Sequence, residues 1–541
     1  MKKFLSIVMV LAMILAMSTT AFAEESTNIT INGEANRTYK GYQLLTLTTS
    51  LKEGEHHPTD CDGTDHKPTC YNYAYSVNPK YKSILQQETL DNGRNALWGS
   101  AGKPTAAEGV TDIQILDYLE GQTKGDGTMR QVADRIYRAI QADGRISEDV
   151  TINGNTGSVA QGYWMFADVT DLNNQTDFAN SLVMVDTIGQ DTITINPKVV
   201  LPTVEKKVKD IEDTEDRNID DNEWLDTADH DIGDLVPFKL TATLSGNASS
   251  YQTYKLVFHD DLADGLTVEP STIKVLMYES QHKANADFDM NDGADVTEKF
   301  TVKTEDLDHA SCDLEIVCDN VLGIEGVTKD TAFVVYYKAT LNQNAVIGGD
   351  GNINKVYLEY SNNPYGDSTG KTKEEQVTVY TYQLKINKVD GENHALQGAE
   401  FTLYKKVLGQ DAPVVVALDS NLGENPTMFT WTGLDDGDYI LKETKVPAGY
   451  NGMTDVEFTI TAMHSKLADG TLKLTALDGG KMGLGDTATG IIDEDIVNRT
   501  GSVLPETGAE GTFMLIFGGS LLVIFAAVFM ITRKKMSVYE D

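Results

Sequence analysis

Short runs of alternating β-branched and aromatic residues recur along this chain, and they constrain its fold more than any other feature. Each run is bounded by Gly, Asn or Asp; examples are LVPFKLTATL, TAFVVYYKATL, KVYLEYSNN and AEFTLYKK. Alternation with period two places successive side chains on opposite faces of a strand. Many such runs with turn signals between them are typical of β-sandwiches. The sequence therefore predicts a mainly β protein of tandem, immunoglobulin-like antiparallel β-sandwiches.

One stretch has helical periodicity instead. The segment MRQVADRIYRAIQADG ends at Gly144 and places four large side chains on one face: Val132, Ile136, Tyr137 and Ile140. Apolar residues at this spacing, followed by Gly, predict an amphipathic helix and its C-terminal end. We expect this helix to pack on the first domain.

The length of 541 residues predicts several domains, because single cores rarely grow past about 250–300 residues. Proline and polar clusters in INPKVVLPTVEKK and NNPYGDSTGKTKEEQ mark two boundaries. We expect the following segments: a signal peptide at 1–23, an N-terminal domain at 24–198, a middle domain at 199–380, a C-terminal domain at 381–500 and a terminal segment at 501–541.

Both ends of the chain have targeting features. Lys2 and Lys3 precede an apolar run, and Ala21-Phe22-Ala23 is a small-x-small cleavage pattern, so the start resembles a secretory signal peptide. A membrane anchor is the alternative, although the run is short of the roughly 20 residues that a membrane span needs.

At the other end of the chain, residues 513–531 are long and apolar enough to span a membrane. The basic residues that follow are expected on the cytoplasmic side. These basic residues are Arg533, Lys534 and Lys535.

The formal net charge of −38 argues against nucleic acid as a partner, because phosphates would repel the chain. The sequence contains no His-Glu-x-x-His, Gly-x-Ser-x-Gly or paired catalytic His motif. A secreted enzyme is therefore a weak alternative, and we expect no cofactor and no metal.

The chain has four cysteines. In an exported protein, local disulfides Cys61–Cys70 and Cys312–Cys318 are the economical pairing, although four cysteines allow three connectivities. Metal binding near the first pair, with His56, His57 and His66, is an alternative.

A pentapeptide precedes the apolar span at the C-terminus. It consists of Leu504, Pro505, Glu506, Thr507 and Gly508. Together with the span and the basic tail, it resembles the sortase sorting signal of Gram-positive surface proteins. The resemblance implies that a sortase cleaves between Thr507 and Gly508 and transfers the Thr507 carbonyl to an amine.

The C-terminal domain contains a strand with Lys-Val-Asp, then Gly-Ala-x-Phe, and later the segment ETKVPAGY. These motifs resemble the collagen-adhesin B-type repeat, a prealbumin-like sandwich. The resemblance implies an isopeptide bond between Lys388 and Asn498, promoted by Glu443. A buried Lys has a lowered pKa, which favours the neutral amine that attacks. The alternative is an exposed Lys at a strand end and an acid in a solvated hairpin.

The middle domain offers a second set of polar residues in phase with apolar ones. Lys206, Asp260 and Asn354 each share a strand face with core residues by period two. Buried polar groups must be satisfied, and a mutual bond would do so. The pattern resembles the middle domain of sortase-assembled pilins, which implies a Lys206–Asn354 bond promoted by Asp260. An error in the alignment with these pilins would instead assign the roles to Lys207, Asp234, Asp261 or Asn362.

A calcium site is an alternative interpretation of DFDMNDGADVTE. Asp287, Asp289, Asn291 and Glu298 imitate the ligands of an EF-hand loop. Gly293 is one place late, however, and no flanking helices are evident, so a polar hairpin is preferred.

The segment DTITINPKVVLP joins the first two domains and resembles the pilin motif of Gram-positive backbone pilins, with Asn196 where Tyr is usual. The resemblance implies that the Lys198 amine accepts Thr507 of the next subunit. Head-to-tail contacts that do not close grow filaments.

The chain is thus identified as a member of the sortase-assembled major pilins, a structural and non-enzymatic backbone subunit on the cell wall. The implied partners are pilus-specific and housekeeping sortases, further copies of the chain, ancillary pilins, peptidoglycan and a host ligand. A monomeric wall-anchored adhesin or an ancillary pilin, either of which would not use Lys198, is the alternative.

Overall fold

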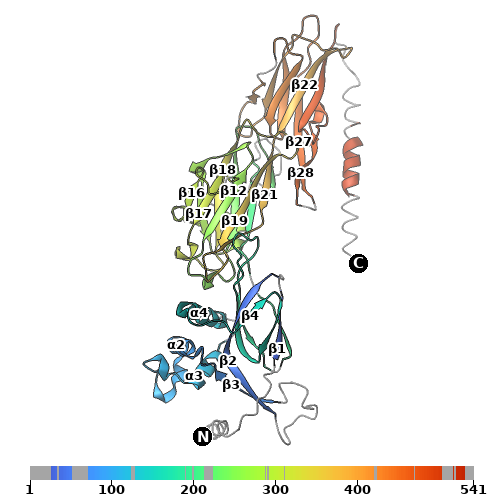
Figure 1. The fold of residues 1–541 in the computed structure, drawn as a ribbon. Helices are drawn as coiled ribbons and strands as arrows, with labels where there is room; N and C mark the ends of the chain where they lie inside the picture. Colours follow the sequence, from blue (N-terminus) through green and yellow to red (C-terminus); the bar gives the residue numbers. More distant parts are fainter. Residues whose placement is uncertain are drawn as a thin grey trace.

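The computed structural model describes residues 26–32, 36–51, 71–122, 128–188, 190–197, 200–211, 223–286, 288, 291–309, 311–419, 423–467, 470–501, 516 and 519–529. Their strands form three groups of sheets that follow one another along an elongated molecule (Figure 1). The chain is mainly β, as predicted.

The first group contains two sheets. One has the strand order β5-β1-β8 and the other β3-β2-β6-β7, with β4 paired to β2. Ile29, Trp164 and Phe166 pack between them. The strands are β1 Ser26–Ile31, β2 Thr38–Leu51, β3 Tyr71–Val77, β4 Val150–Asn153, β5 Thr156–Ala160, β6 Gly162–Asp168, β7 Leu182–Asp186 and β8 Thr192–Ile195.

Three α-helices accompany this first group: α2 Lys82–Asn92, α3 Asp112–Glu120 and α4 Thr128–Asp143. The predicted helix is α4, and the four apolar residues expected on its inner face are all buried. The other two helices were not predicted. Figure 1 shows all three beside the sheet that contains β2 and β3.

The middle group forms a sandwich. One sheet has the order β10-β21-β19-β12-β17-β16, with β20 on β19, and the other β15-β14-β18-β11-β9, with β13 on β18. Phe238, Phe258 and Leu358 are fully buried in its core. The first strands are β9 Val204–Val208, β10 Thr227–Asp229, β11 Leu235–Thr243, β12 Leu256–Leu262, β13 Leu266–Val268, β14 Lys274–Tyr278 and β15 Ala294–Asp295. They are followed by β16 Thr301–Lys303, β17 Leu314–Cys318, β18 Ala332–Leu341, β19 Asn352–Ser361, β20 Thr369–Lys371 and β21 Glu375–Tyr380, and the helix α5 is Gln281–Ala286.

The third group is a smaller sandwich with sheets β25-β22-β29 and β24-β23-β26-β27-β28. Its core includes Trp431, Tyr439 and Ile460. The strands are β22 Tyr382–Asp390, β23 Glu400–Lys405, β24 Val414–Val416, β25 Met428–Leu434, β26 Gly437–Lys445, β27 Val456–Lys466, β28 Leu472–Asp478 and β29 Ile491–Asn498.

Not all strand pairs are antiparallel. An early strand and the last strand of each group run parallel: β1 with β8, β10 with β21 and β22 with β29. Parallel neighbours need a long connection, and here the rest of the group supplies it. The chain therefore enters each group at one end and leaves at the other, which produces the elongated arrangement.

Polar contacts join consecutive groups. Asp134 of α4 accepts hydrogen bonds from Ser250 Oγ (2.6 Å) and from the Tyr365 hydroxyl, both in the middle group. At the next junction, Asp231 accepts hydrogen bonds from Lys405 Nζ (2.5 Å) and from the Asp435 backbone N–H (2.8 Å). Charge-assisted hydrogen bonds of this kind have a specific geometry and favour one orientation of neighbouring units.

The structure describes the expected span 513–531 only at residue 516 and over 519–529, where the chain is helical. Within the described ranges, no helix has both the length and the apolar character needed to cross a membrane.

Candidate functional site

The core of the middle sandwich contains the three polar residues that the sequence predicted there. β9 contributes Lys206, β12 contributes Asp260 and β19 contributes Asn354. Asp260 and Asn354 are fully buried, and Lys206 is 2% exposed. Alternation on the strands explains their position, because each lies in phase with core residues such as Val204, Phe258 and Val356.

These three side chains and one tyrosine form a closed hydrogen-bonded ring. Lys206 Nζ donates to Asp260 Oδ1 and to Asn354 Oδ1, the latter at 2.5 Å. Asn354 Nδ2 donates to the Tyr337 hydroxyl at 2.7 Å, and that hydroxyl donates to Asp260 Oδ2, also at 2.7 Å. Every polar group in this core pocket is therefore satisfied by another member.

Burial changes the ionisation of the ring. It lowers the pKa of Lys206 to about 8, although the nearby Asp260 charge opposes this shift. Burial also raises the pKa of Asp260, against the opposing effect of Lys206. Both shifts disfavour the ion pair and favour a neutral amine beside a protonated carboxyl group. A neutral amine is a nucleophile, and a protonated acid can polarise an amide carbonyl.

Sequence reasoning missed Tyr337. It lies on β18, in the sheet that faces β12 and β19. Burial, and to a lesser extent the Asp260 charge, holds the pKa of Tyr337 well above its usual range. A signal was present, since Tyr337 is one of two adjacent tyrosines in TAFVVYYKATL and only one of them can face the core.

The neighbouring residues considered as substitutes lie elsewhere. Lys207 Nζ pairs with Asp226 at 2.7 Å, and Asp234 pairs with His230 at 3.7 Å. Asp261 is exposed. Asn362 is buried at the junction with the first group, where its Nδ2 donates to the Leu172 carbonyl at 2.8 Å.

The third sandwich places Lys388 and Asn498 on the adjacent parallel strands β22 and β29, and both are buried. Asn498 Nδ2 donates to Glu443 Oε1 at 2.6 Å, so the predicted acid contacts the predicted amide. Lys388 Nζ donates to the carbonyls of Val389 (3.1 Å) and Ile496 (2.8 Å) rather than to the Asn498 side chain. Burial lowers the pKa of Lys388.

Among the residues that the structure describes, the buried Asn498 Oδ1 has no hydrogen-bond partner. A buried carbonyl oxygen without a partner is costly. This atom is therefore a point at which a further donor, or a covalent change at the amide, would lower the free energy of the folded chain.

The predicted Cys312–Cys318 disulfide is wrong. Both cysteines are free and buried. Cys318 ends β17 and Cys312 precedes the strand by two residues. The extended strand Leu314–Cys318 separates the two cysteines, whereas a disulfide requires Cα atoms within about 7 Å of each other.

Several predicted residues lie outside the described part of the chain. They are Cys61, Cys70, Lys198, the sorting pentapeptide Leu504, Pro505, Glu506, Thr507 and Gly508, the residues His56, His57 and His66 of the N-terminal metal alternative, and Asp287 and Asp289 of the calcium alternative. Of the residues near them, Asn196 follows β8 and accepts a hydrogen bond from Asn32 Nδ2 at 2.6 Å. Glu298 pairs with Lys299 at 2.9 Å.

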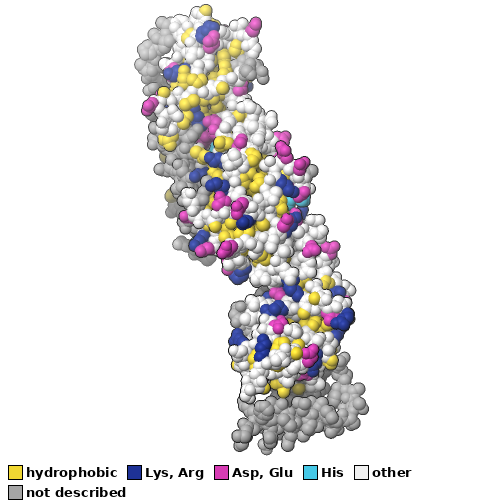
Figure 2. All heavy atoms as spheres, turned by 90° about the vertical axis from the view of Figure 1, so that its left-hand side faces the viewer, with side chains coloured by type: hydrophobic (Ala, Val, Ile, Leu, Met, Phe, Trp, Pro, Cys, Tyr) yellow, Lys and Arg dark blue, Asp and Glu magenta, His cyan; other side chains and the backbone are white. Residues whose placement is uncertain are grey.

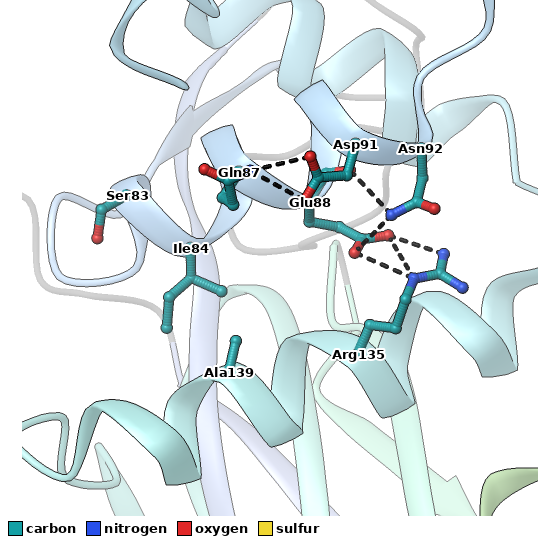
Figure 3. Close-up of a pocket in the computed structure, with 8 residues that line it drawn as sticks. All are labelled: Ser83, Ile84, Gln87, Glu88, Asp91, Asn92, Arg135 and Ala139. Carbon is teal, nitrogen blue, oxygen red and sulfur yellow. Dashed lines mark hydrogen bonds and ion pairs between the residues drawn. The ribbon is translucent and has the colours of Figure 1, made fainter. Parts of the chain in front are cut away.

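A shallow pocket lies between α2 and α4 (Figure 3). Figure 3 shows Glu88 and Arg135 facing one another, and their closest oxygen–nitrogen distance is 2.8 Å. Gln87 donates to Asp91 at 2.9 Å on the same helix. The polar side chains named here are thus engaged with each other, and the pocket has the character of a helix–helix seam.

Family comparisons assign three parts of the chain. Residues 232–364 match the Gram-positive pilin backbone subunit 2, Cna-B-like domain, and this range includes Asp260, Tyr337 and Asn354. This part of the chain is therefore similar to a domain of the Gram-positive backbone pilins. Residues 382–484 match the SpaA prealbumin-like fold domain, and residues 497–537 match the LPXTG cell wall anchor motif. The anchor motif indicates a surface protein that is anchored to the cell wall.

The chain is also similar to individual pilin proteins. The trypsin-resistant surface T6 protein of Streptococcus pyogenes serotype M6 is 26% identical over 279 residues, which cover 49% of this chain and 46% of the relative. The chain thus aligns with about half of the length of that relative. The solved T6 backbone pilin of the same serotype is 19% identical, covers 90% of this chain and 100% of its own, and gives a TM-score of 0.47. The major pilin SpaD of Corynebacterium diphtheriae is 15% identical, with coverages of 88% and 98% and a TM-score of 0.40.

Proposed function

We propose that this chain is the structural backbone subunit of a covalently polymerised cell-surface pilus. The observation that carries the proposal is the buried ring of Lys206, Asp260, Asn354 and Tyr337. All of its members except Lys206 lie in the range that matches the pilin backbone domain. A fibre subunit needs tensile strength, and a covalent bond between the first and last parts of a sandwich supplies it.

The ring has the groups needed for an isopeptide bond. The neutral Lys206 amine attacks the Asn354 side-chain carbonyl carbon, and the protonated Asp260 polarises the carbonyl and transfers protons. The C–N bond to the leaving amide nitrogen breaks, and one ammonia is released. The product is an amide that joins β9 to β19. Tyr337 holds the Asn354 nitrogen and the Asp260 carboxyl group in position.

The same reaction is proposed for Lys388 and Asn498, with Glu443 as the acid. Support comes from the Asn498–Glu443 hydrogen bond and from the unsatisfied Asn498 Oδ1. Lys388 Nζ must leave the Ile496 carbonyl and move toward Asn498, which lies two residues further along the same strand.

Polymerisation is proposed to join Thr507 of one subunit to Lys198 of the next. In the sequence, Lys198 follows the last residue of β8 by three positions and precedes β9. We propose domain limits at 24–198, 199–380 and 381–500, and a Cys61–Cys70 disulfide in the first domain. The proposed partners are pilus-specific and housekeeping sortases, other copies of the chain, ancillary pilins, peptidoglycan and a host ligand.

Figure 2 shows acidic and basic side chains interspersed along one face of the molecule. This distribution suits a solvated rod rather than a surface that binds a polyanion.

The proposal is tested in a Gram-positive host that expresses the matching sortase. Wall extracts are boiled in SDS and reductant and then immunoblotted for wild type, Lys198→Ala and the matched control Lys209→Ala. A ladder that is present in wild type and control but lost in Lys198→Ala supports the proposal. A single band in all three strains contradicts polymerisation, and a ladder that survives Lys198→Ala contradicts the proposed acceptor.

A further inference from the structure

A cluster of metal-ligating side chains lies on the outer face of the middle sandwich. His259 of β12 faces Glu315 of β17 as its direct partner in the antiparallel register. Cys312 and His309 come from the connection that leads into β17. Since successive residues of a strand point to opposite faces, His259 lies on the side of the sheet away from its neighbour Asp260. The cluster is therefore separate from the buried ring.

Two distances within this cluster match the edges of a coordination tetrahedron, and the distance that involves sulfur is somewhat longer. His259 Nδ1 lies 3.3 Å from Glu315 Oε1, and His309 Nδ1 lies 3.4 Å from the same oxygen. Cys312 Sγ lies 3.9 Å from His259 Nδ1. Bond lengths of about 2.0 Å to N and O and about 2.3 Å to S, at tetrahedral angles, place neighbouring ligands about 3.3–3.6 Å apart. The ligand atoms of His259, Cys312 and Glu315 all lie within 4.8 Å of one another.

A second set of contacts orients the ligands. His259 Nε2–H donates to Glu359 Oε2 at 3.3 Å, and Lys255 Nζ donates to the other oxygen of that carboxylate at 2.8 Å. When Nδ1 binds a metal ion, the His259 proton is on Nε2, where the Glu359 carboxylate accepts its hydrogen bond. Carboxylates hold metal-ligating histidines in the same manner.

Burial distinguishes the cluster from ordinary surface groups. Glu315 is fully buried and His259 is 2% exposed. The backbone N–H groups of Asp308 (3.1 Å) and His309 (3.0 Å) donate to the Glu315 carboxylate. His309 is exposed and gives an ion access from solvent. Lys303 Nζ lies 3.9 Å from the other oxygen, Glu315 Oε2. A metal ion at Oε1 would compensate the buried carboxylate at closer range.

We propose that His259 Nδ1, Cys312 Sγ and Glu315 Oε1 bind one Zn²⁺ ion and that His309, whose Nδ1 contacts Glu315 Oε1, turns to supply the fourth ligand. Nitrogen and sulfur ligands in this number and geometry favour Zn²⁺ over Ca²⁺ or Mg²⁺. Binding forms a Zn–S bond and releases the Cys312 thiol proton to solvent. The ion fastens the connection between β16 and β17 to the outer face of β12. It also protects Cys312, one of the two free thiols in the described part of the chain, from oxidation.

The competing explanation is an imidazolium ion of His259 held between Glu315 and Glu359, with no metal. A second metal position, on the Nε2 side of His259 with His309 and Glu359, is also geometrically possible. The position on the Nδ1 side is preferred because it includes the thiol and leaves Glu359 free to orient the ring. Only that position requires Cys312.

The full chain is stripped with a chelator and titrated with Co²⁺ and then Zn²⁺. We expect the visible absorption of tetrahedral Co²⁺, a near-ultraviolet thiolate-to-cobalt band, one equivalent bound, and displacement by Zn²⁺. Cys312→Ser removes the thiolate band, and His309→Asn weakens binding at least about tenfold. His309 is exposed, so that variant retains the fold.

The matched controls are Cys318→Ser, a buried free thiol at the other end of β17, and His394→Asn, an exposed histidine. Both must bind as wild type does. Absence of a thiolate band in wild type, or binding that survives both Cys312→Ser and His309→Asn, overturns the proposal. The second result would assign the metal to other ligands of the chain.

Discussion

Lys206 Nζ donates a 2.5 Å hydrogen bond to the side-chain oxygen of Asn354, and both groups are sealed in the core of the middle sandwich. The two residues are far apart in sequence and lie on strands of opposite sheets. A covalent bond between them would join the two layers of the sandwich.

The mass of the purified chain reports this bond directly. We expect wild type to be lighter than its sequence mass by one ammonia for each isopeptide bond, two in total. Asp260→Ala should lose only one ammonia, because the acid of the middle domain is missing while that of the third remains. Intact-mass spectrometry measures both. Asp261→Ala, which changes an exposed neighbour, is the control and should match wild type. An unshifted wild-type mass would contradict the proposed chemistry.

Tyr337→Phe tests the positioning contact. Loss of the hydroxyl removes the hydrogen bonds to Asp260 and Asn354 without a large change in volume. We expect slower bond formation, visible as a mixture of linked and unlinked middle domains in freshly purified protein. The mixture should convert to the linked form with time, because Lys206 and Asp260 remain. Tyr336→Phe, on the opposite face of the same strand, should be fully linked. Complete linkage of Tyr337→Phe at the earliest time would show that the hydroxyl plays no part.

Glu443→Ala tests the third domain. We expect it to leave Lys388 and Asn498 unlinked and to lower the thermal stability of that domain. Crosslinks that restrict the unfolded chain typically contribute about 2–4 kcal/mol, by analogy with disulfides. Calorimetry and peptide mapping together separate loss of the bond from loss of the fold. Glu400→Ala, an acid on the adjacent strand paired with Lys445 at 2.7 Å, is the control. An intact Lys388–Asn498 peptide in Glu443→Ala would reject the assigned acid.

The lowered pKa of Lys206 predicts a pH dependence in a chain that cannot form the middle bond. In Asn354→Ala the amine remains, with a folded pKa below its ordinary value of 10.5. Between about pH 8 and 10.5, the unfolded chain therefore holds a proton that the folded chain has lost. Stability should rise with pH in this window, by at most about 1.4 kcal/mol per pH unit. Urea unfolding at several pH values measures the slope. The double variant with Lys206→Met should lack this part of the slope, and an equal slope in both would contradict the lowered pKa.

The sequence predicted the residues of the middle site because strand alternation is a local property. Lys206, Asp260 and Asn354 each stood in phase with apolar neighbours, so their burial followed without knowledge of the strand pairing. Tyr337 was missed because an aromatic residue in a strand is ordinary core material, and its hydroxyl gains a role only when β18 is placed opposite β12. The His259 cluster likewise depends on the β12–β17 register, which alternation alone does not determine.

The helices of the first domain show the same limit. The amphipathic pattern of α4 was strong enough to predict it, but α3 is short and was passed over. Its start carried a readable signal, because Thr111 and Gln114 form a capping box. The Cys312–Cys318 error arose because sequence proximity was used in place of strand geometry.

The most direct test of the account is the junction between subunits. Pilus polymer is purified from the wall and digested, and branched peptides are sequenced by mass spectrometry. The account predicts a peptide in which the Thr507 carbonyl is joined to the Lys198 ε-amine. Polymer whose Thr507 is joined to a different lysine, or protein in which Thr507 is linked only to peptidoglycan, would contradict it.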